Sequence, residues 1–161
     1  MFSLETASAE EIDLVKQMEA RAVYLLAMRE HGSKELKRKL KEKFPETENR
    51  PNLVDFVILT CQKNGWLSDE RFVEISVRQG IEKGHGPYKI RQTLQQRTDA
   101  SDLIEMYLEM DDSDWAEIAK AALEKKYGDA IKPKEMKEQA RRMRFLQSRG
   151  FSQSQIWKAM R

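Results

Sequence analysis

A short glycine turn between two helical patterns occurs three times in this chain, and it limits the possible folds more than any other feature. The clearest copy is residues 83–94, where Gly84 can end one helix with a positive φ and Gly86–Pro87 can begin the next. Matching positions of the three copies are Arg29, Lys83 and Arg149 at the turn; Gly32, Gly86 and Ser152 at the cap; Leu36, Ile90 and Ile156 seven residues after the turn; Leu40, Leu94 and Met160 eleven after it; and Val23, Val77 and Met143 six before it. We therefore predict a threefold helical repeat.

Apolar residues follow a helical period along the whole chain, and no segment has the alternation of a strand. The expected fold class is therefore all-α. The expected helices are 13–29, 33–44, 53–64, one capped by Ser68, 87–97, one capped by Asp99 or Ser101, one from Ser113 to Gly128, one after Pro133 that runs to Arg149, and 153–160. Ser68-Asp69 and Ser113-Asp114 resemble matching helix starts, so module borders could lie there instead of before each basic turn. The expected divisions are a polar lead-in at 1–12 and modules at 13–67, 68–112 and 113–161.

Composition favours an elongated array of helices over a compact globule. Charged residues make up 35% of the 161 residues, and the mean hydropathy is −0.74. The single cysteine, Cys61, excludes an internal disulfide framework and fits a reducing compartment. No stretch has the roughly 20 apolar residues of a membrane span, and the first residues do not form a signal peptide. We expect a cytoplasmic protein that does not bind a membrane.

Charge is segregated along the chain, although the formal net charge is only +2. Residues 99–117 contain eight acids and no Lys or Arg, whereas residues 132–161 contain nine bases against two acids. Residues 34–43 contain six bases against two acids. Basic surfaces suit a phosphate backbone, and an acidic surface suits a basic protein partner. Helix faces that are simply solvated would give similar runs of charge, and this alternative remains open.

No group of residues forms a recognisable catalytic or cofactor site. His31 and His85 lack a second ligand at metal spacing, and Cys61 lies within an apolar helical pattern. Gly84 and Gly86 have neither the preceding strand nor the other glycines of a phosphate loop. Trp66, Trp115 and Trp157 are interpreted as packing residues. We expect no enzyme activity, no cofactor and no metal.

Four motifs run through most of the chain: AVYLLAMR at 22–29 with Glu35-Leu36 and Lys39-Leu40, GWLSDERF at 65–72, GHGPYKIR at 84–91, and RFLQSRGFS at 144–152. Together these motifs resemble those of the RecX family, bacterial regulators of the RecA recombinase. Two positions depart from the family pattern. Gly32 replaces a common cap serine, which weakens that cap. Arg97-Thr98-Asp99 replaces a Lys-Gly-Ile-like turn, so the end of the preceding helix is not defined.

The resemblance implies three tandem three-helix modules in a curved array, and binding along the groove of the RecA–DNA filament. It also implies inhibition of recombinase, ATPase and coprotease activities. The expected partners are RecA and single- and double-stranded DNA, with the chain itself a monomer. The residues expected to contact the filament or DNA are Lys83, Lys89, Arg91, Arg144, Arg149, Lys37, Arg38 and Lys41.

Individual basic residues also have other interpretations. Lys89 and Arg91 follow a helix N-terminus, which itself favours phosphate. Arg29 and Arg149, in the last turn of a helix, could instead satisfy carbonyl groups there.

Other functions also fit the sequence. A helix-turn-helix-like protein that binds bare DNA without RecA would lose affinity steeply as salt rises. A helical adaptor that binds only protein would respond neither to DNA nor to salt. An enzyme is the third alternative.

Overall fold

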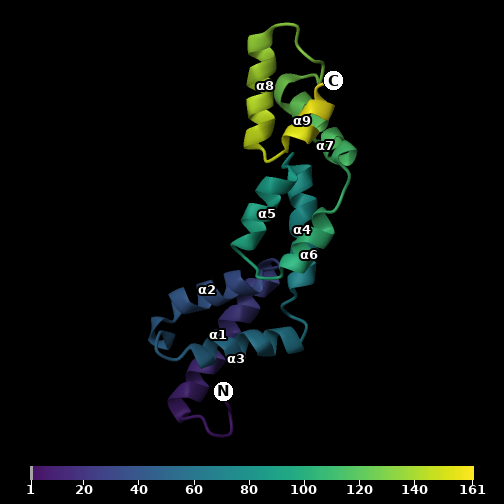
Figure 1. The fold of residues 1–161 in the computed structure, drawn as a ribbon. Coiled ribbons are helices and arrows are strands. Elements are labelled where there is room, and N and C mark those ends of the chain that lie inside the picture. The colour runs from purple at the N-terminus through teal and green to yellow at the C-terminus, as the bar shows by residue number, and fades with distance from the viewer. Residues whose placement is uncertain (1) are drawn as a thin grey trace. The chain divides into compact units, whose positions relative to one another are not determined.

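The protein is all-helical over residues 2–161, which the computed structural model describes (Figure 1). Met1, the first residue of the expected lead-in, lies outside the described residues. The described residues form nine α-helices and one short 3-10 turn, with no strand, which confirms the expected fold class. The elements are α1 (Ala9–Met28), α2 (Ser33–Lys43), η1 (Pro45–Thr47), α3 (Pro51–Lys63), α4 (Asp69–Glu82), α5 (Pro87–Gln95), α6 (Ser101–Leu108), α7 (Asp112–Tyr127), α8 (Met136–Ser148) and α9 (Gln153–Ala159).

The chain divides into two compact units. Unit 1 comprises Met1–Phe72 with Gln96–Ala100. In it α1, α2 and α3 pack against one another around a buried apolar cluster. Each helix contributes residues three or four positions apart, which places them on one face. They are Leu14, Met18, Ala22 and Leu25 from α1, Leu36 and Leu40 from α2, and Val54, Val57, Ile58 and Cys61 from α3.

Unit 2 comprises Val73–Gln95 with Ser101–Arg161. In it α5 packs against α6, α7 packs against α9, and α8 contacts both α7 and α9. Its fully buried large side chains include Leu94, Ile104, Trp115, Leu123 and Leu146.

The first helix begins earlier than the sequence pattern predicts. It starts at Ala9, inside the segment expected to be a lead-in before residue 13. Ser8 is the reason, because it forms a capping box with Glu11. The Ser8 hydroxyl accepts from the Glu11 amide, and the Glu11 carboxylate accepts from the Ser8 amide, both over 3.1 Å.

The seventh helix, α7, also begins earlier than the start at Ser113 that the sequence predicts. Ser68 caps α4 as expected, since its hydroxyl accepts a hydrogen bond from the Arg71 amide. Ser113, by contrast, lies inside α7, whose cap residue is Asp111. The two Ser-Asp pairs are therefore not equivalent helix starts.

The repeated positions have equivalent environments in the second helix of each pair. Leu36, Ile90 and Ile156 are buried, as are Leu40, Leu94 and Met160. Each cap residue also receives the first hydrogen bond of its helix. The carbonyls of Gly32, Gly86 and Ser152 accept from the amides of residues 36, 90 and 156, over 2.9, 3.1 and 2.9 Å.

The position six residues before the turn does not share this equivalence. Val77 is buried there, whereas Val23 and Met143 are exposed. The interpretation of all three tryptophans as packing residues is right only for Trp115. Trp66 is 44% exposed and Trp157 is 66% exposed.

Candidate nucleic-acid interface

Two glycine turns meet in unit 2 through their backbones. One is the turn between α4 and α5 and the other is the turn between α8 and α9, with Gly84 and Gly150 at positive φ. The Gly86 amide donates to the Arg149 carbonyl over 2.8 Å, and the Tyr88 amide donates to the Gly150 carbonyl over 3.0 Å. A Cβ on Gly86 would lie 2.5 Å from the Gly150 oxygen, so only glycine allows this contact.

This contact changes the interpretation of the α5 N-terminus. The exposed amides of a helix N-terminus can hold a phosphate. Here the Tyr88 amide already donates to Gly150, and a Cβ on Gly150 would lie 2.4 Å from the Lys89 amide nitrogen. The Gly86 and Tyr88 amides at the start of α5 therefore already donate to the α8–α9 turn, which leaves less of this helix start for a phosphate.

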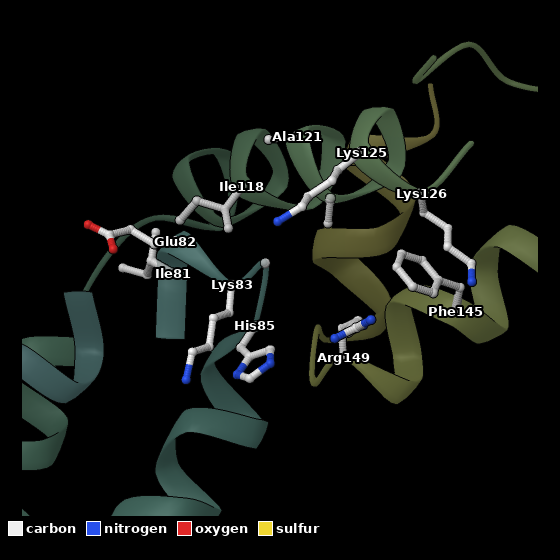
Figure 2. Close-up of a pocket in the computed structure, with 12 residues that line it drawn as sticks. Ile81, Glu82, Lys83, His85, Ile118, Ala121, Lys125, Lys126, Phe145 and Arg149 are labelled. Carbon is white, nitrogen blue, oxygen red and sulfur yellow. The ribbon is translucent and has the colours of Figure 1, made fainter. Parts of the chain in front are cut away.

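A cleft of about 540 Å³ lies beside this junction, within unit 2 (Figure 2). Its walls come from the end of α4 with the following turn, from α7, and from α8. The polar and charged lining residues are Glu82, Lys83, His85, Lys125, Lys126 and Arg149. The apolar part is Ile81, Ile118, Ala121, Ala122 and Phe145, with Gly84 between the two.

The cations of the cleft come from three helix ends. Lys83 follows α4, Lys125 and Lys126 lie in the last turn of α7, and Arg149 follows α8. Among residues 2–161, none of these four side chains makes an ion pair with a carboxylate. Glu82 is the only acid in the lining. The cleft therefore has uncompensated positive charge.

Among the described residues, the Arg149 side chain makes no hydrogen bond to the carbonyl groups at the end of α8. Its guanidinium lies over the Phe145 ring, with Cζ 5.1 Å from the ring centroid, and the Lys126 ammonium lies 5.8 Å from the same centroid. Phe145 in turn makes an edge contact with Tyr127, at 5.6 Å between centroids. This aromatic contact holds two cations at one side of the cleft.

Arg29, the counterpart of Arg149 in the first repeat, is neutralised. Its guanidinium donates to both Glu35 carboxylate oxygens, over 3.1 and 2.6 Å, and to the Glu30 carbonyl. Burial alone would raise the pKa of Glu35, but the hydrogen bonds and charge of Arg29 outweigh it and leave that pKa below its usual value. Arg29 therefore has a structural role.

The difference between these turns originates at one position of the repeat, six residues after the basic residue. That position holds Glu35 in the first copy, Lys89 in the second and Gln155 in the third. Glu35 pairs with Arg29, whereas Gln155 belongs to the capping box of α9. In the second copy a lysine adds charge where the first copy removes it.

His85 lies among these cations. Burial is the main cause that lowers the pKa of His85, and the charges of Lys89, Arg149 and Lys83 lower it further. While the cleft holds no anion, these charges and the burial disfavour the protonated form of His85.

Comparison with known proteins agrees with the repeat. A family model described as the second three-helix domain of RecX matches residues 68–108, and one described as the third matches residues 112–160. The regulatory protein RecX of Vibrio parahaemolyticus is 42% identical over 135 residues, which cover 84% of each chain. That of Halorhodospira halophila is 37% identical, over 84% of this chain and 81% of the relative. The chain belongs to the RecX family of regulatory proteins.

Solved RecX structures have the same fold. The crystal structure of RecX from Lactobacillus salivarius matches with a TM-score of 0.72 at 18% identity, over 92% of this chain and 95% of that one. A second RecX crystal structure matches with a TM-score of 0.68 at 20% identity, over 89% and 71%. The predicted tandem arrangement of three-helix modules is confirmed. The RecX matches to residues 68–108 and 112–160 leave the exact module borders as predictions.

The other expected contact residues of this RecX chain are dispersed. In unit 2, Arg91 forms two hydrogen bonds with the Glu105 carboxylate, over 2.6 and 3.1 Å, and Arg144 is exposed on α8. In unit 1, Lys37 pairs with Asp55 at 2.8 Å and Arg38 with Glu42 at 3.1 Å, while Lys41 is exposed. Of the eight expected contact residues, Lys83 and Arg149 line the cleft. Lys89 does not line it, but its charge acts on His85, which does.

Sequence reasoning missed Lys125 and Lys126. They lie outside the three repeated turns and between the acidic segment 99–117 and the basic segment 132–161. Their sequence signal is the position just before Gly128, which ends α7 with φ of 90°. Two lysines in the last turn of a helix interact favourably with the helix dipole and give that end of the helix a positive charge.

Within the described part of the chain, no three His, Cys, Asp or Glu side chains lie close enough together to hold a metal ion. No helix there is long and apolar enough to cross a membrane. Cys61 is buried, and burial raises the pKa of its thiol to about 11, so it is not a reactive thiolate at neutral pH.

Proposed function

We propose that this RecX chain regulates RecA by binding the RecA–DNA filament, with the cationic cleft of unit 2 in contact with the phosphate backbone. Binding there inhibits the recombinase, ATPase and coprotease activities of RecA, while the chain itself catalyses nothing. The observation that supports this is the convergence of Lys83, Lys125, Lys126 and Arg149 from three helix ends without carboxylate partners.

The chemistry of the cleft suits phosphate groups. Arg149 is held over Phe145, so part of its side-chain freedom is already lost before an anion arrives. Lysine ammonium groups contribute point charges that do not require one fixed geometry. Because the chain carries a net charge of only +2, attraction to a polyanion must come from such a local concentration of charge.

The acidic segment of unit 2 suits a protein contact. Asp102, Glu109, Asp111 and Asp114 make no ion pair among the residues that the structure describes, and Glu117 pairs only with Lys120 on α7, at 3.2 Å. Asp102, Glu109, Asp111 and Asp114 are exposed. An acidic surface attracts a basic protein surface and is repelled by DNA. We propose that this segment faces RecA, while the cleft faces DNA.

Helix-turn-helix binding to bare duplex is less consistent with the helix starts. A recognition helix reads base edges with its N-terminal residues. The start of α5 is covered by the α8–α9 turn. The start of α2 is covered as well, since the Ser33 amide donates to Asp69 over 2.8 Å and the Glu35 amide donates to the Arg97 carbonyl over 3.0 Å.

The decisive experiment is RecA-catalysed ATP hydrolysis on single-stranded DNA with substoichiometric amounts of this protein. We expect the wild-type chain to inhibit hydrolysis. The double variant Lys126→Glu, Arg149→Glu should lose most of the inhibition, because it reverses two cations at one side of the cleft. Absence of inhibition by the wild-type chain at every salt concentration would refute the filament proposal.

A matched control is the double variant Lys16→Glu, Lys63→Glu. Both lysines are exposed in unit 1 and make no ion pair among residues 2–161, so the change in net charge is the same. We expect this control to inhibit like the wild type. If both double variants lose inhibition equally, net charge rather than the cleft determines binding. Tight binding to bare duplex without any effect on RecA would favour the helix-turn-helix alternative.

A further inference from the structure

His85 is the one titratable group of the cleft whose charge changes near neutral pH. Figure 2 shows its ring in the cleft wall with Lys83 nearby, and Arg149 lies on the neighbouring wall. We propose that His85 takes up a proton when a phosphate group occupies the cleft, so that it becomes an additional cation of the site and makes anion binding depend on pH. The inference rests on the proposed function, because it concerns the same cleft.

The elements around His85 bring charged side chains to the cleft, and those of Lys89, Arg149 and Lys83 lower the pKa of His85. The end of α4 contributes Lys83 and the single acid Glu82, and α5 contributes Lys89. The α7 wall contributes Lys125 and Lys126, and the end of α8 contributes Arg149. The nearby cations Lys83, Lys89 and Arg149 favour the neutral imidazole while the cleft holds no anion.

The ring nitrogens of His85 are available to a ligand. Among residues 2–161, neither nitrogen of His85 has a hydrogen-bond partner, although the residue is only partly exposed. An imidazolium can donate from both nitrogens to phosphate oxygens, and such charge-assisted hydrogen bonds are strong. A bound phosphate therefore offers His85 both a counter-charge and an acceptor.

His31, the counterpart of His85 in the first repeat, has no such capacity. Its Nδ1 lies 3.1 Å from the Arg29 carbonyl and its Nε2 lies 3.0 Å from the Lys39 ammonium. A carbonyl only accepts and an ammonium only donates, so the ring is neutral with its proton on Nδ1. Both nitrogens are already used, and the residue is buried. His31 is therefore an internal control for His85.

Linkage fixes the sign of the effect. If an anion raises the pKa of His85, protonation of His85 must raise the affinity for the anion by the same factor. Affinity should therefore increase as pH falls through the pKa of His85. Each unit by which the anion raises this pKa corresponds to a tenfold gain between a pH above both pKa values and a pH below both.

The test is isothermal titration calorimetry of the full chain with a short single-stranded oligothymidylate. Thymine and phosphodiester groups do not titrate near the pKa of histidine, so protons taken up belong to the protein. Runs in two buffers of different ionisation enthalpy at one pH give the number of protons bound. We expect a positive fraction of one proton near about pH 6.5, and none at about pH 8.5. NMR titration should move the His85 midpoint upward on addition of the oligonucleotide, while the His31 signals stay unchanged.

Three variants assign the proton. His85→Phe copies Phe151, the residue at the same position of the third repeat, and His85→Gln keeps a polar side chain of similar size. Both should abolish proton uptake, and if one fails to fold the other still decides. Glu82→Gln removes the only carboxylate of the lining and should leave proton uptake in place.

The outcomes separate this inference from the proposed function. Oligonucleotide binding without proton uptake, or with uptake that persists in both His85 variants, would refute the role of His85 while RecA inhibition stands. Absence of oligonucleotide binding at every pH would refute the phosphate-binding cleft itself, and the role of His85 with it. RecA-catalysed ATP hydrolysis, measured separately, reports on the proposed function alone.

Discussion

Glu35 and Lys89 occupy the same position of the repeat, six residues after the basic residue of the turn. Glu35 is nearly fully buried and accepts two hydrogen bonds from Arg29. Breaking a buried pair of this kind leaves an uncompensated charge, so the ion pair of the first turn has a structural role. Lys89 makes no such pair among the described residues, so the charge of the second turn is not neutralised in this way.

Lys89→Glu should convert the second turn into a self-neutralised turn like the first. The position is the third residue of α5, where an acid is favourable to the helix dipole, so the fold should persist. We expect affinity for a single-stranded oligonucleotide to fall at least about tenfold at low salt, because one contact is lost and a neighbouring cation is neutralised. Calorimetry measures the affinity, and circular dichroism at 222 nm checks the helicity. Lys89→Gln should lose less affinity than Lys89→Glu. Unchanged affinity in Lys89→Glu would show that Lys89 does not contact the oligonucleotide.

His31 predicts a decrease in stability on acidification. Its pKa is lowered in the folded protein, first by burial. Above about pH 6.5, the pKa of an unfolded histidine, both states are neutral and the stabilising arrangement is intact. As pH falls below that value, the unfolded chain binds the proton first, so stability is lost until the pH passes the lowered folded pKa.

The measurement is urea unfolding of the wild-type chain and of His31→Phe at about pH 7.5 and about pH 5.5. Each unit by which the pKa is lowered corresponds to about 1.4 kcal/mol of lost stability. The variant should show a smaller difference between the two pH values, with the part due to His85 remaining. An identical pH dependence in both proteins would show that His31 is not the responsible group.

At the scale of elements, the caps of α2 and α5 come from segments distant in sequence. Gly32 offers no side-chain cap to α2, and the sequence therefore predicted a weak helix start. The structure compensates with Asp69, which accepts from the Ser33 amide and hydroxyl, and with the Arg97 carbonyl, which accepts from Glu35. A Cβ at Gly32 would lie 2.1 Å from that carbonyl oxygen, so the glycine is required by the partner. Such caps are invisible to local patterns.

The cap positions Gly86 and Ser152 should respond differently to substitution. Gly86→Ala places a Cβ against the Gly150 backbone, so the junction must open or shift. We expect a loss of about 3 kcal/mol of unfolding free energy, from overpacking and from two backbone hydrogen bonds. Ser152→Ala should cost about 1 kcal/mol, since it removes only a hydroxyl that accepts from the Gln155 amide.

Urea unfolding followed by helicity gives both values, and Ser152→Gly is the control, with an expected cost of a few tenths of a kcal/mol relative to the wild type. If Gly86→Ala is no more destabilising than Ser152→Ala, the Gly86 junction does not constrain unit 2.

At the scale of the whole molecule, the repeat was readable because it depends on local chemistry. A glycine with positive φ, a cap residue and two apolar residues four apart are all written in consecutive residues, so Lys83 and Arg149 could be recognised from the sequence. The sequence also marks Lys125 and Lys126 as a basic helix end before Gly128, but their place at the cleft depends on the tertiary packing of α7 and could not be recognised. The ion pair of Arg91 with Glu105 also depends on tertiary packing, because it joins α5 to α6, so the sequence did not show that Arg91 is paired. A list of basic residues therefore cannot separate paired cations from available ones.

Since the net charge is only +2, we expect the salt dependence of any nucleic-acid binding to reflect the proposed cleft contacts more than the overall charge. If three phosphates of a single strand are neutralised, log affinity should fall with log salt at a slope of about −2, roughly a twentyfold loss between about 50 and 200 mM. Arg149→Glu should reduce the magnitude of that slope by about 0.7, because one phosphate contact disappears. Arg38→Glu, in which the lost cation was already paired with Glu42, should leave the slope nearly unchanged. Fluorescence anisotropy with a pH-insensitive dye measures the slopes of the wild type and of the two variants. Equal slopes in the wild type and Arg149→Glu would show that the phosphates bind elsewhere on the chain.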